Sequence, residues 1–86
     1  MNETIKSILL TNLFHFENNH YTKNEKFIEA KRRKAIAILD EDAEELKEVD
    51  AELSEEYEET ISYLDSISDE DYQSLKEELL QQVEEN

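Results

Sequence analysis

Residues 41–66, EDAEELKEVDAELSEEYEETISYLDS, contain the pattern that decides the expected fold. Apolar side chains recur there every three or four residues, which is the spacing of one face of an α-helix. We therefore expect one long helix over this stretch, about 39 Å in length at ~1.5 Å per residue. Its apolar stripe runs slightly past the stretch and consists of Ala43, Leu46, Val49, Leu53, Tyr57, Ile61, Leu64 and Ile67.

Two alternative boundaries fit the same spacing. Helical spacing persists from Leu39 to Ala43. The first alternative is therefore that the long helix and the one before it form a single helix through Asp40. A break near Ser54 is the second alternative, and it would divide the long helix into two shorter ones.

Three further segments show apolar residues at helical spacing, namely 3–15, 23–39 and 69–84. Helix-starting signals precede two of them. Ser68 is an N-cap candidate before three acidic residues, and Thr22 with Glu25 has the form of a capping box. The prediction is an all-α fold: one domain over residues 1–86, built as a small bundle of three to four helices with one long acidic helix.

The composition favours helices and argues against several other structural features. The chain has no Gly and no Pro, which argues against a fold rich in β-hairpins, because tight turns usually need these residues. It also has no Cys, so disulfides and thiolate metal sites are excluded. The apolar run at residues 8–10 is too short for a signal peptide or a membrane span, and a cytoplasmic protein is expected.

The first helix is apolar on more than one side. One face is expected to enter the core, while Leu10 and Phe14 point elsewhere and are candidates for the interface of a homo-oligomer. The face expected in the core consists of Ile5, Ile8, Leu9, Leu13 and Phe16.

Charge is distributed unequally along the chain. The net charge is −15, with four acidic and seven basic residues in 1–39 against twenty acidic and two basic residues in 40–86. The basic cluster at residues 31–34 is expected to fold back beside the acids, the alternative being a patch for phosphate. A charge of this size repels nucleic acids and anionic membranes, so neither is expected as a direct partner, and it attracts basic surfaces.

A ridge of carboxylates is expected on the long helix, opposite its apolar stripe. Like charges four residues apart destabilise a helix by ~0.2–0.5 kcal/mol per pair, and Lys47 is the only base between Asp40 and Glu59. Twelve acids over about 29 Å of helix approach the charge density of duplex DNA, one per ~1.7 Å. The ridge, predicted to bind a basic partner, consists of Glu41, Glu44, Glu48, Glu52, Glu55 and Glu59.

Known patterns for metal sites and catalysis do not fit. Asp40, Asp42 and Glu44 resemble the start of a calcium loop, but Glu45 and Ala51 stand where that loop needs Gly and Glu. His15 and His20 are five residues apart, which is not the spacing of a helical zinc pair. No metal, no cofactor and no catalytic residue are therefore predicted.

These observations lead to two functional hypotheses. The first is a non-enzymatic inhibitor or regulator that mimics DNA and docks its acidic ridge on a basic, nucleic-acid-binding protein. A phage origin and action against host defence would suit such a protein. The second is a structural or assembly module that self-associates through Leu10, Phe14 and the surface of the first helix.

Overall fold

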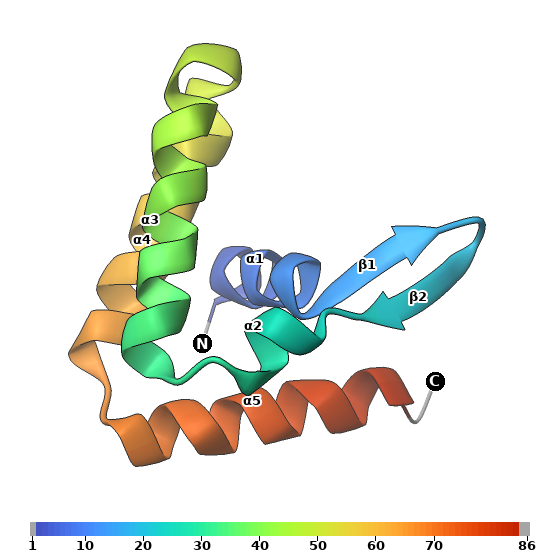
Figure 1. The fold of residues 1–86 in the computed structure, drawn as a ribbon. Helices are drawn as coiled ribbons and strands as arrows, with labels where there is room; N and C mark the ends of the chain where they lie inside the picture. The colour runs from blue at the N-terminus through green and yellow to red at the C-terminus, as the bar shows by residue number, and fades with distance from the viewer. Residues whose placement is uncertain (1, 85–86) are drawn as a thin grey trace.

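The computed structural model describes residues 2–84, and most of them lie in helices (Figure 1). The helix pair α3 (Arg32–Val49) and α4 (Ala51–Ser66) projects from the rest of the fold, while α5 (Asp69–Glu84) crosses the base of that pair. α1, α2 and a β-hairpin lie to one side of it. In chain order the elements are α1 (Glu3–Leu13), β1 (Phe14–Glu17), β2 (His20–Lys23), α2 (Glu25–Glu29), α3 (Arg32–Val49), α4 (Ala51–Ser66) and α5 (Asp69–Glu84).

The boundaries expected at 23–39 and 41–66 are wrong, whereas the alternative of a helix continuous through Asp40 is confirmed by α3. The break lies at Asp50, four residues before the position considered at Ser54. The Asp50 N–H closes α3 by donating to the Leu46 carbonyl at 2.7 Å, and its carboxylate accepts the Leu53 N–H at 3.1 Å. Asp is a preferred N-cap residue, so a single residue ends one helix and starts the next.

The reversal at Asp50 makes α3 and α4 an antiparallel pair. The two buried faces meet where the Ser54 hydroxyl donates to the Ala43 carbonyl at 2.7 Å. Each helix thus covers the apolar stripe of the other, which explains why one stripe continued through both. Val49, expected within that stripe, lies at the reversal instead and is 84% exposed.

A β-hairpin replaces the end of the first predicted helix and the loop expected after it. The expectation of a purely helical bundle is wrong here, because Asn18 and Asn19 adopt φ values of 52° and 65° without Gly. Asn tolerates this left-handed region, and two such residues form the tight turn that joins paired strands. The register pairs Phe14 with Lys23 and Phe16 with Tyr21.

The core contains most of the residues that helical spacing placed there. The expected face of α1 is confirmed as buried, apart from Phe16, which the hairpin carries out to 61% exposure. Tyr57, expected in the apolar stripe, is buried, and so is Tyr72 on α5. The buried apolar set is Ile5, Ile8, Leu9, Leu13, Phe14, Phe27, Ala30, Ala35, Leu39, Ala43, Tyr57, Leu64, Tyr72 and Leu79.

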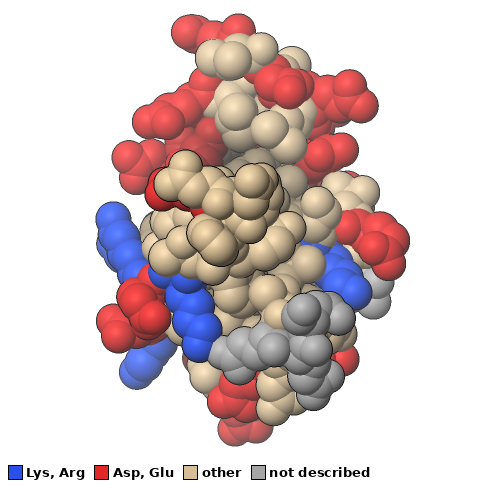
Figure 2. Space-filling model, turned by 90° about the vertical axis from the view of Figure 1, so that its right-hand side faces the viewer, with Lys and Arg blue, Asp and Glu red and all other residues tan. Residues whose placement is uncertain are grey.

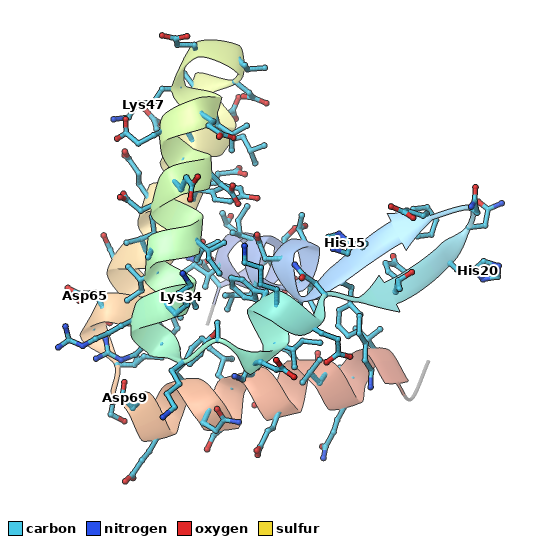
Figure 3. All side chains as sticks on the ribbon, viewed as in Figure 1. His15, His20, Lys34, Lys47, Asp65 and Asp69 are labelled. Atoms are coloured by element: carbon cyan, nitrogen blue, oxygen red, sulfur yellow. The ribbon has the colours of Figure 1, made fainter. Side chains whose placement is uncertain are left out.

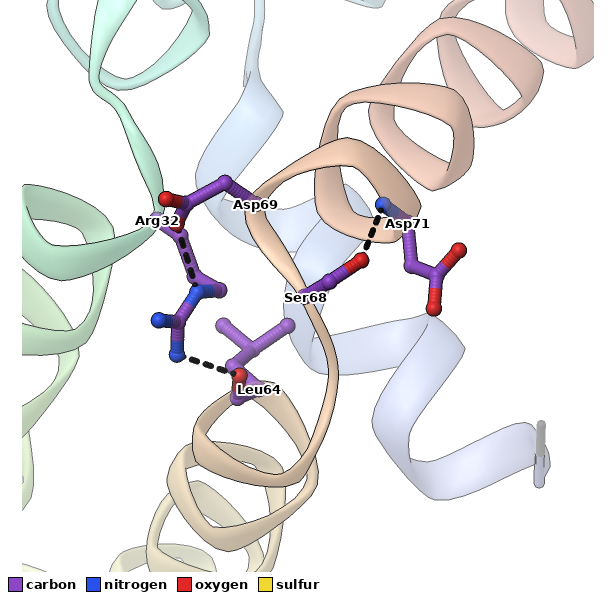
Figure 4. A network of polar contacts seen from close by, with 5 residues as sticks. All are labelled: Arg32, Leu64, Ser68, Asp69 and Asp71. Atoms are coloured by element: carbon purple, nitrogen blue, oxygen red, sulfur yellow. Dashed lines mark hydrogen bonds and ion pairs between the residues drawn. The ribbon is translucent and has the colours of Figure 1, made fainter.

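Local capping signals are confirmed at one helix and wrong at another. α5 has the predicted bounds, and the Ser68 hydroxyl accepts the Asp71 N–H at 3.0 Å (Figure 4). The capping box at Thr22 does not form, because Thr22 belongs to β2 and the Asn24 side chain caps α2 instead. Across residues 2–84, none of the helices has the length and apolar character needed to cross a membrane.

Candidate functional site

The acidic arm is defined here as residues 40–59, which comprise the end of α3, the reversal at Asp50 and the first half of α4. Lys47 is its only basic residue. Figure 2 shows Asp and Glu side chains on both flanks of the arm, at the top of the view. Its twelve acids are Asp40, Glu41, Asp42, Glu44, Glu45, Glu48, Asp50, Glu52, Glu55, Glu56, Glu58 and Glu59.

The reversal at Asp50 concentrates this charge. A single continuous helix would spread the twelve acids over about 29 Å, but the folded arm holds them within about 15 Å, the rise of residues 40–49. This amounts to roughly one carboxylate per 1.2 Å of arm length, compared with one phosphate per ~1.7 Å of duplex DNA. The charge density of the arm therefore exceeds the one expected from the sequence.

The six glutamates of the predicted ridge are all exposed, but the structure does not bring them into one row. Glu41, Glu44 and Glu48 lie on α3, whereas the other three lie on α4. Each triad occupies the face of its helix that points away from the partner helix, since the opposite faces are buried in the α3–α4 contact. The expectation of a single ridge is therefore corrected to two rows on different sides of the arm.

Lys47 lies on the acidic arm (Figure 3) and forms ion pairs with glutamates of both of its helices. Its ammonium Nζ lies 2.9 Å from Glu44 Oε1 and 3.9 Å from Glu58 Oε1. The hydrogen bond to Glu44 raises the pKa of Lys47 above its ordinary value, and the charges of Glu44 and Glu58 add to that rise. One cation thus balances only a small part of the arm's negative charge.

Burial and neighbouring carboxylates both disfavour the charge of Asp42. Partial burial raises the pKa of its carboxyl group, and repulsion from Glu45 and Glu41 raises it further. A raised pKa means that the folded arm disfavours the negative charge at this position. The arm consequently holds part of its charge at a cost to its own stability.

The base of the arm is joined to the rest of the fold by directed contacts. The Asn2 side-chain Nδ2 donates to Glu59 Oε1 at 2.8 Å, while the side-chain Oδ1 of the same residue accepts the Ile5 N–H and caps α1. These bonds join α4 to the start of α1. The base of the acidic arm is thus linked to the start of α1 by a side-chain hydrogen bond.

The basic cluster lies at the end of α3 remote from the tip of the arm. Arg32 Nε donates to Asp69 Oδ1 at 2.8 Å, and its Nη1 donates to the Leu64 carbonyl at 3.1 Å (Figure 4). The expectation that this cluster folds back on the acids of the long helix is corrected in this respect: Arg32 pairs with the start of α5. The ion pair and the hydrogen bond to Leu64 join the start of α3 to the connection between α4 and α5.

Metal ligands do not gather within residues 2–84, where no group of three or more His, Asp or Glu side chains could hold an ion. His15 and His20 lie on the two strands of the hairpin and are exposed (Figure 3). The acids of the arm are numerous, but no three of their carboxylates lie close enough together to bind one metal ion.

The second predicted surface, at Leu10 and Phe14, lies beside a groove of about 820 Å³. Phe14 is only 7% exposed and belongs to the core, so its expected role as an outward-facing residue is corrected. Phe16 and Tyr21 are the exposed aromatic residues of this region, at 61% and 68%. A signal for them existed in the alternation of Phe14, His15 and Phe16 before two asparagines, which is typical of a hairpin.

No protein-family model, curated protein or solved structure matches this chain. The acidic arm is the most distinctive feature of the candidate site.

Proposed function

We propose that this chain is a non-enzymatic binding protein that mimics duplex DNA. Its acidic arm occupies the basic groove of a nucleic-acid-binding protein and thereby inhibits or regulates that protein. The observation that carries the proposal is the density of carboxylates on both flanks of a projecting two-helix arm. An origin in a phage and a role against host defence belong to this proposal.

The arrangement of the two glutamate rows supports a duplex as the mimicked ligand. A duplex presents two lines of phosphate, one on each strand, and proteins that bind it place Lys and Arg against both. The rows on α3 and α4 likewise present charge on different sides of one rod. A flat basic surface would contact one row only, whereas a groove that accommodates a duplex would contact both.

The charge pattern also supports an electrostatic mode of recognition. Opposite charges steer encounter and account for much of the affinity of duplex-binding proteins, and salt screens both effects. Binding through the arm is therefore expected to weaken as the NaCl concentration rises. The proposal assigns the chain no reaction and no cofactor.

The test compares three tagged forms of the chain as bait in a lysate of its native cell. These are the wild type, the arm variant Glu48→Lys/Glu52→Lys/Glu55→Lys, and the control Asp65→Lys/Glu77→Lys/Glu78→Lys. The control has the same net charge as the arm variant, but its changes lie outside the arm. Circular dichroism checks that helicity is unchanged.

The captured protein is then purified and loaded with a fluorescent DNA duplex. We expect the wild type and the control to capture it and to displace the duplex, while the arm variant does neither. Equal capture by the arm variant and the control would show that the arm is only a solvated acidic face. Capture without displacement of the duplex would contradict mimicry.

A further inference from the structure

The β-hairpin is amphipathic, which follows from its register. Phe14, Phe16 and Tyr21 share one face because Phe16 pairs with Tyr21 and Phe14 is two residues away on the same strand. The rings of Phe16 and Tyr21 are 4.9 Å apart between centroids, and Phe14 meets Tyr21 edge-on at 6.4 Å. The opposite face carries His15 and other polar residues.

Phe14 is buried in the core, but the outer part of the aromatic face, Phe16 and Tyr21, is not covered by the rest of the described chain. Phe16 and Tyr21 remain mostly exposed, and they border the groove of about 820 Å³ that continues to Leu10 on α1 and Val83 on α5. Continuous exposed apolar surface of this kind usually marks a binding site. A two-stranded hairpin is also only marginally stable in water by itself, so packing on this face would stabilise it.

The charge of the groove distinguishes it from the acidic arm. Glu3 and Lys6 are the only formally charged residues among the described side chains that line it, so their charges cancel. A basic partner would find no attraction here. A second copy of a chain with a net charge of −15, by contrast, would meet the least repulsion at such a neutral surface.

The mixed charge of the groove also fits pairing of the groove with itself. In a two-fold dimer the same surface of each copy forms the interface, so that surface must be complementary to itself. One acid and one base on the same helix, Glu3 and Lys6, meet that requirement, whereas a surface of a single sign does not. The arm projects in a different direction from the hairpin, so pairing at the groove leaves the arms free (Figure 1).

We propose that a second copy of this chain covers the groove, forming a two-fold dimer through the aromatic faces of the two hairpins. Phe16 and Tyr21 of each copy pack against the groove of the other, with Glu3 and Lys6 at the edge. Such a dimer presents two acidic arms and does not depend on what the arms bind.

Salt separates this contact from binding by the arm. Because both copies are strongly negative, NaCl screens their repulsion and should lower the dissociation constant of the dimer. The same salt should raise the dissociation constant of a complex made through the acidic arm. The two proposals can therefore fail separately.

The test is sedimentation velocity and native mass spectrometry on the wild-type chain over a series of concentrations at low and high NaCl. We expect a species of twice 10.2 kDa whose dissociation constant falls as salt increases. The variant Phe16→Ser/Tyr21→Ser should raise that constant by about tenfold or more, as expected for lost aromatic packing. The control His20→Ser/Thr22→Ser changes the face of β2 opposite Tyr21, at two residues that do not line the groove, and should leave the dissociation constant unchanged.

Circular dichroism of both hairpin variants checks that the helices are intact, and the wild-type series tests the dimer without any substitution. A wild type that stays monomeric at every concentration and salt would overturn the proposal. A dimer that weakens with salt, or that survives loss of Phe16 and Tyr21, would also overturn it. Burial of the groove by a protein captured through the arm, in place of a second copy, would do the same.

Discussion

The Ser54 hydroxyl donates a hydrogen bond of 2.7 Å to the backbone carbonyl of Ala43, and both groups are buried between α3 and α4. The two residues are eleven positions apart in the chain, and the bond joins α3 to α4 close to the reversal at Asp50. A small polar side chain at this position lets the helices approach closely while its hydroxyl remains paired. The acidic arm is therefore held together at its tip by a polar contact as well as by apolar packing.

Removing this contact should weaken the arm. We expect Ser54→Ala to lower the free energy of unfolding by about 1 kcal/mol, the usual net value of one buried hydrogen bond. Urea denaturation monitored by circular dichroism measures the change. Ser62→Ala, at an exposed position on α4, is the matched control and should have little effect; equal losses from both variants would count against the bond.

The reversal at Asp50 should depend on its carboxylate. Asp50→Ala removes the cap of α4 and is expected to cost about 0.5–2 kcal/mol, because the Leu53 N–H loses its acceptor. Asp50→Asn keeps a capping oxygen and should retain most of the stability. The same urea experiment compares the two, and a variant with Ala as stable as the one with Asn would show that the cap contributes nothing.

Neutralising Asp42 should relieve crowding in the arm. We expect Asp42→Asn to raise stability near neutral pH by about 0.2–0.5 kcal/mol, the repulsion of like charges on adjacent turns. The folded state raises the pKa of Asp42 above 3.8, so it binds the proton more tightly than the unfolded state does. The gain should therefore shrink as the pH falls through this raised pKa and vanish well below 3.8, where both states are protonated.

Urea titrations at several pH values measure this difference between Asp42→Asn and the wild type. Asp65→Asn on α4 is the control, for an exposed acid outside the arm. A gain from Asp42→Asn that persists unchanged in acid would mean that its cause is not the charge.

Replacing Tyr72 by Phe should stabilise the protein. Tyr72 is 2% exposed, and its hydroxyl has no hydrogen-bond partner among the described residues. An unpaired buried polar group costs about 1–3 kcal/mol, so removing it should recover part of that cost. The Lys76 ammonium, 5.3 Å from the centre of the Tyr72 ring, would keep its contact with the face of a Phe ring.

The same substitution should change the response to alkaline pH. Burial raises the pKa of Tyr72 to about 12 from 10.0, so the wild type loses stability as the pH rises from 10 towards 12. Below pH 10 the advantage of Tyr72→Phe should be constant, and above it the advantage should grow. Tyr63→Phe on α4 is the control, and a loss of stability from Tyr72→Phe at pH 7 would show that its hydroxyl is paired.

Local signals predicted α5 and the core face of α1 because each depends on residues close in sequence. Ser68 and the acids after it start α5 wherever that helix packs, and Ile5, Ile8 and Leu9 share a face in any helix. The hairpin was missed because the absence of Gly was given more weight than the two asparagines. Asn18 and Asn19 adopt the positive φ values that Gly would otherwise supply.

The helical character of most of residues 32–66, the inward orientation of their apolar stripe apart from Val49, and the carboxylates of the arm follow from the sequence by itself. Only the tertiary structure decided that the chain reverses at Asp50, because periodicity identifies the face that is buried and not the element that buries it. An interrupted helix folded on itself buries the same residues as a straight helix packed against another. That reversal turned one expected ridge into two rows of charge on a short arm, and the hairpin placed Phe16 and Tyr21 at the surface.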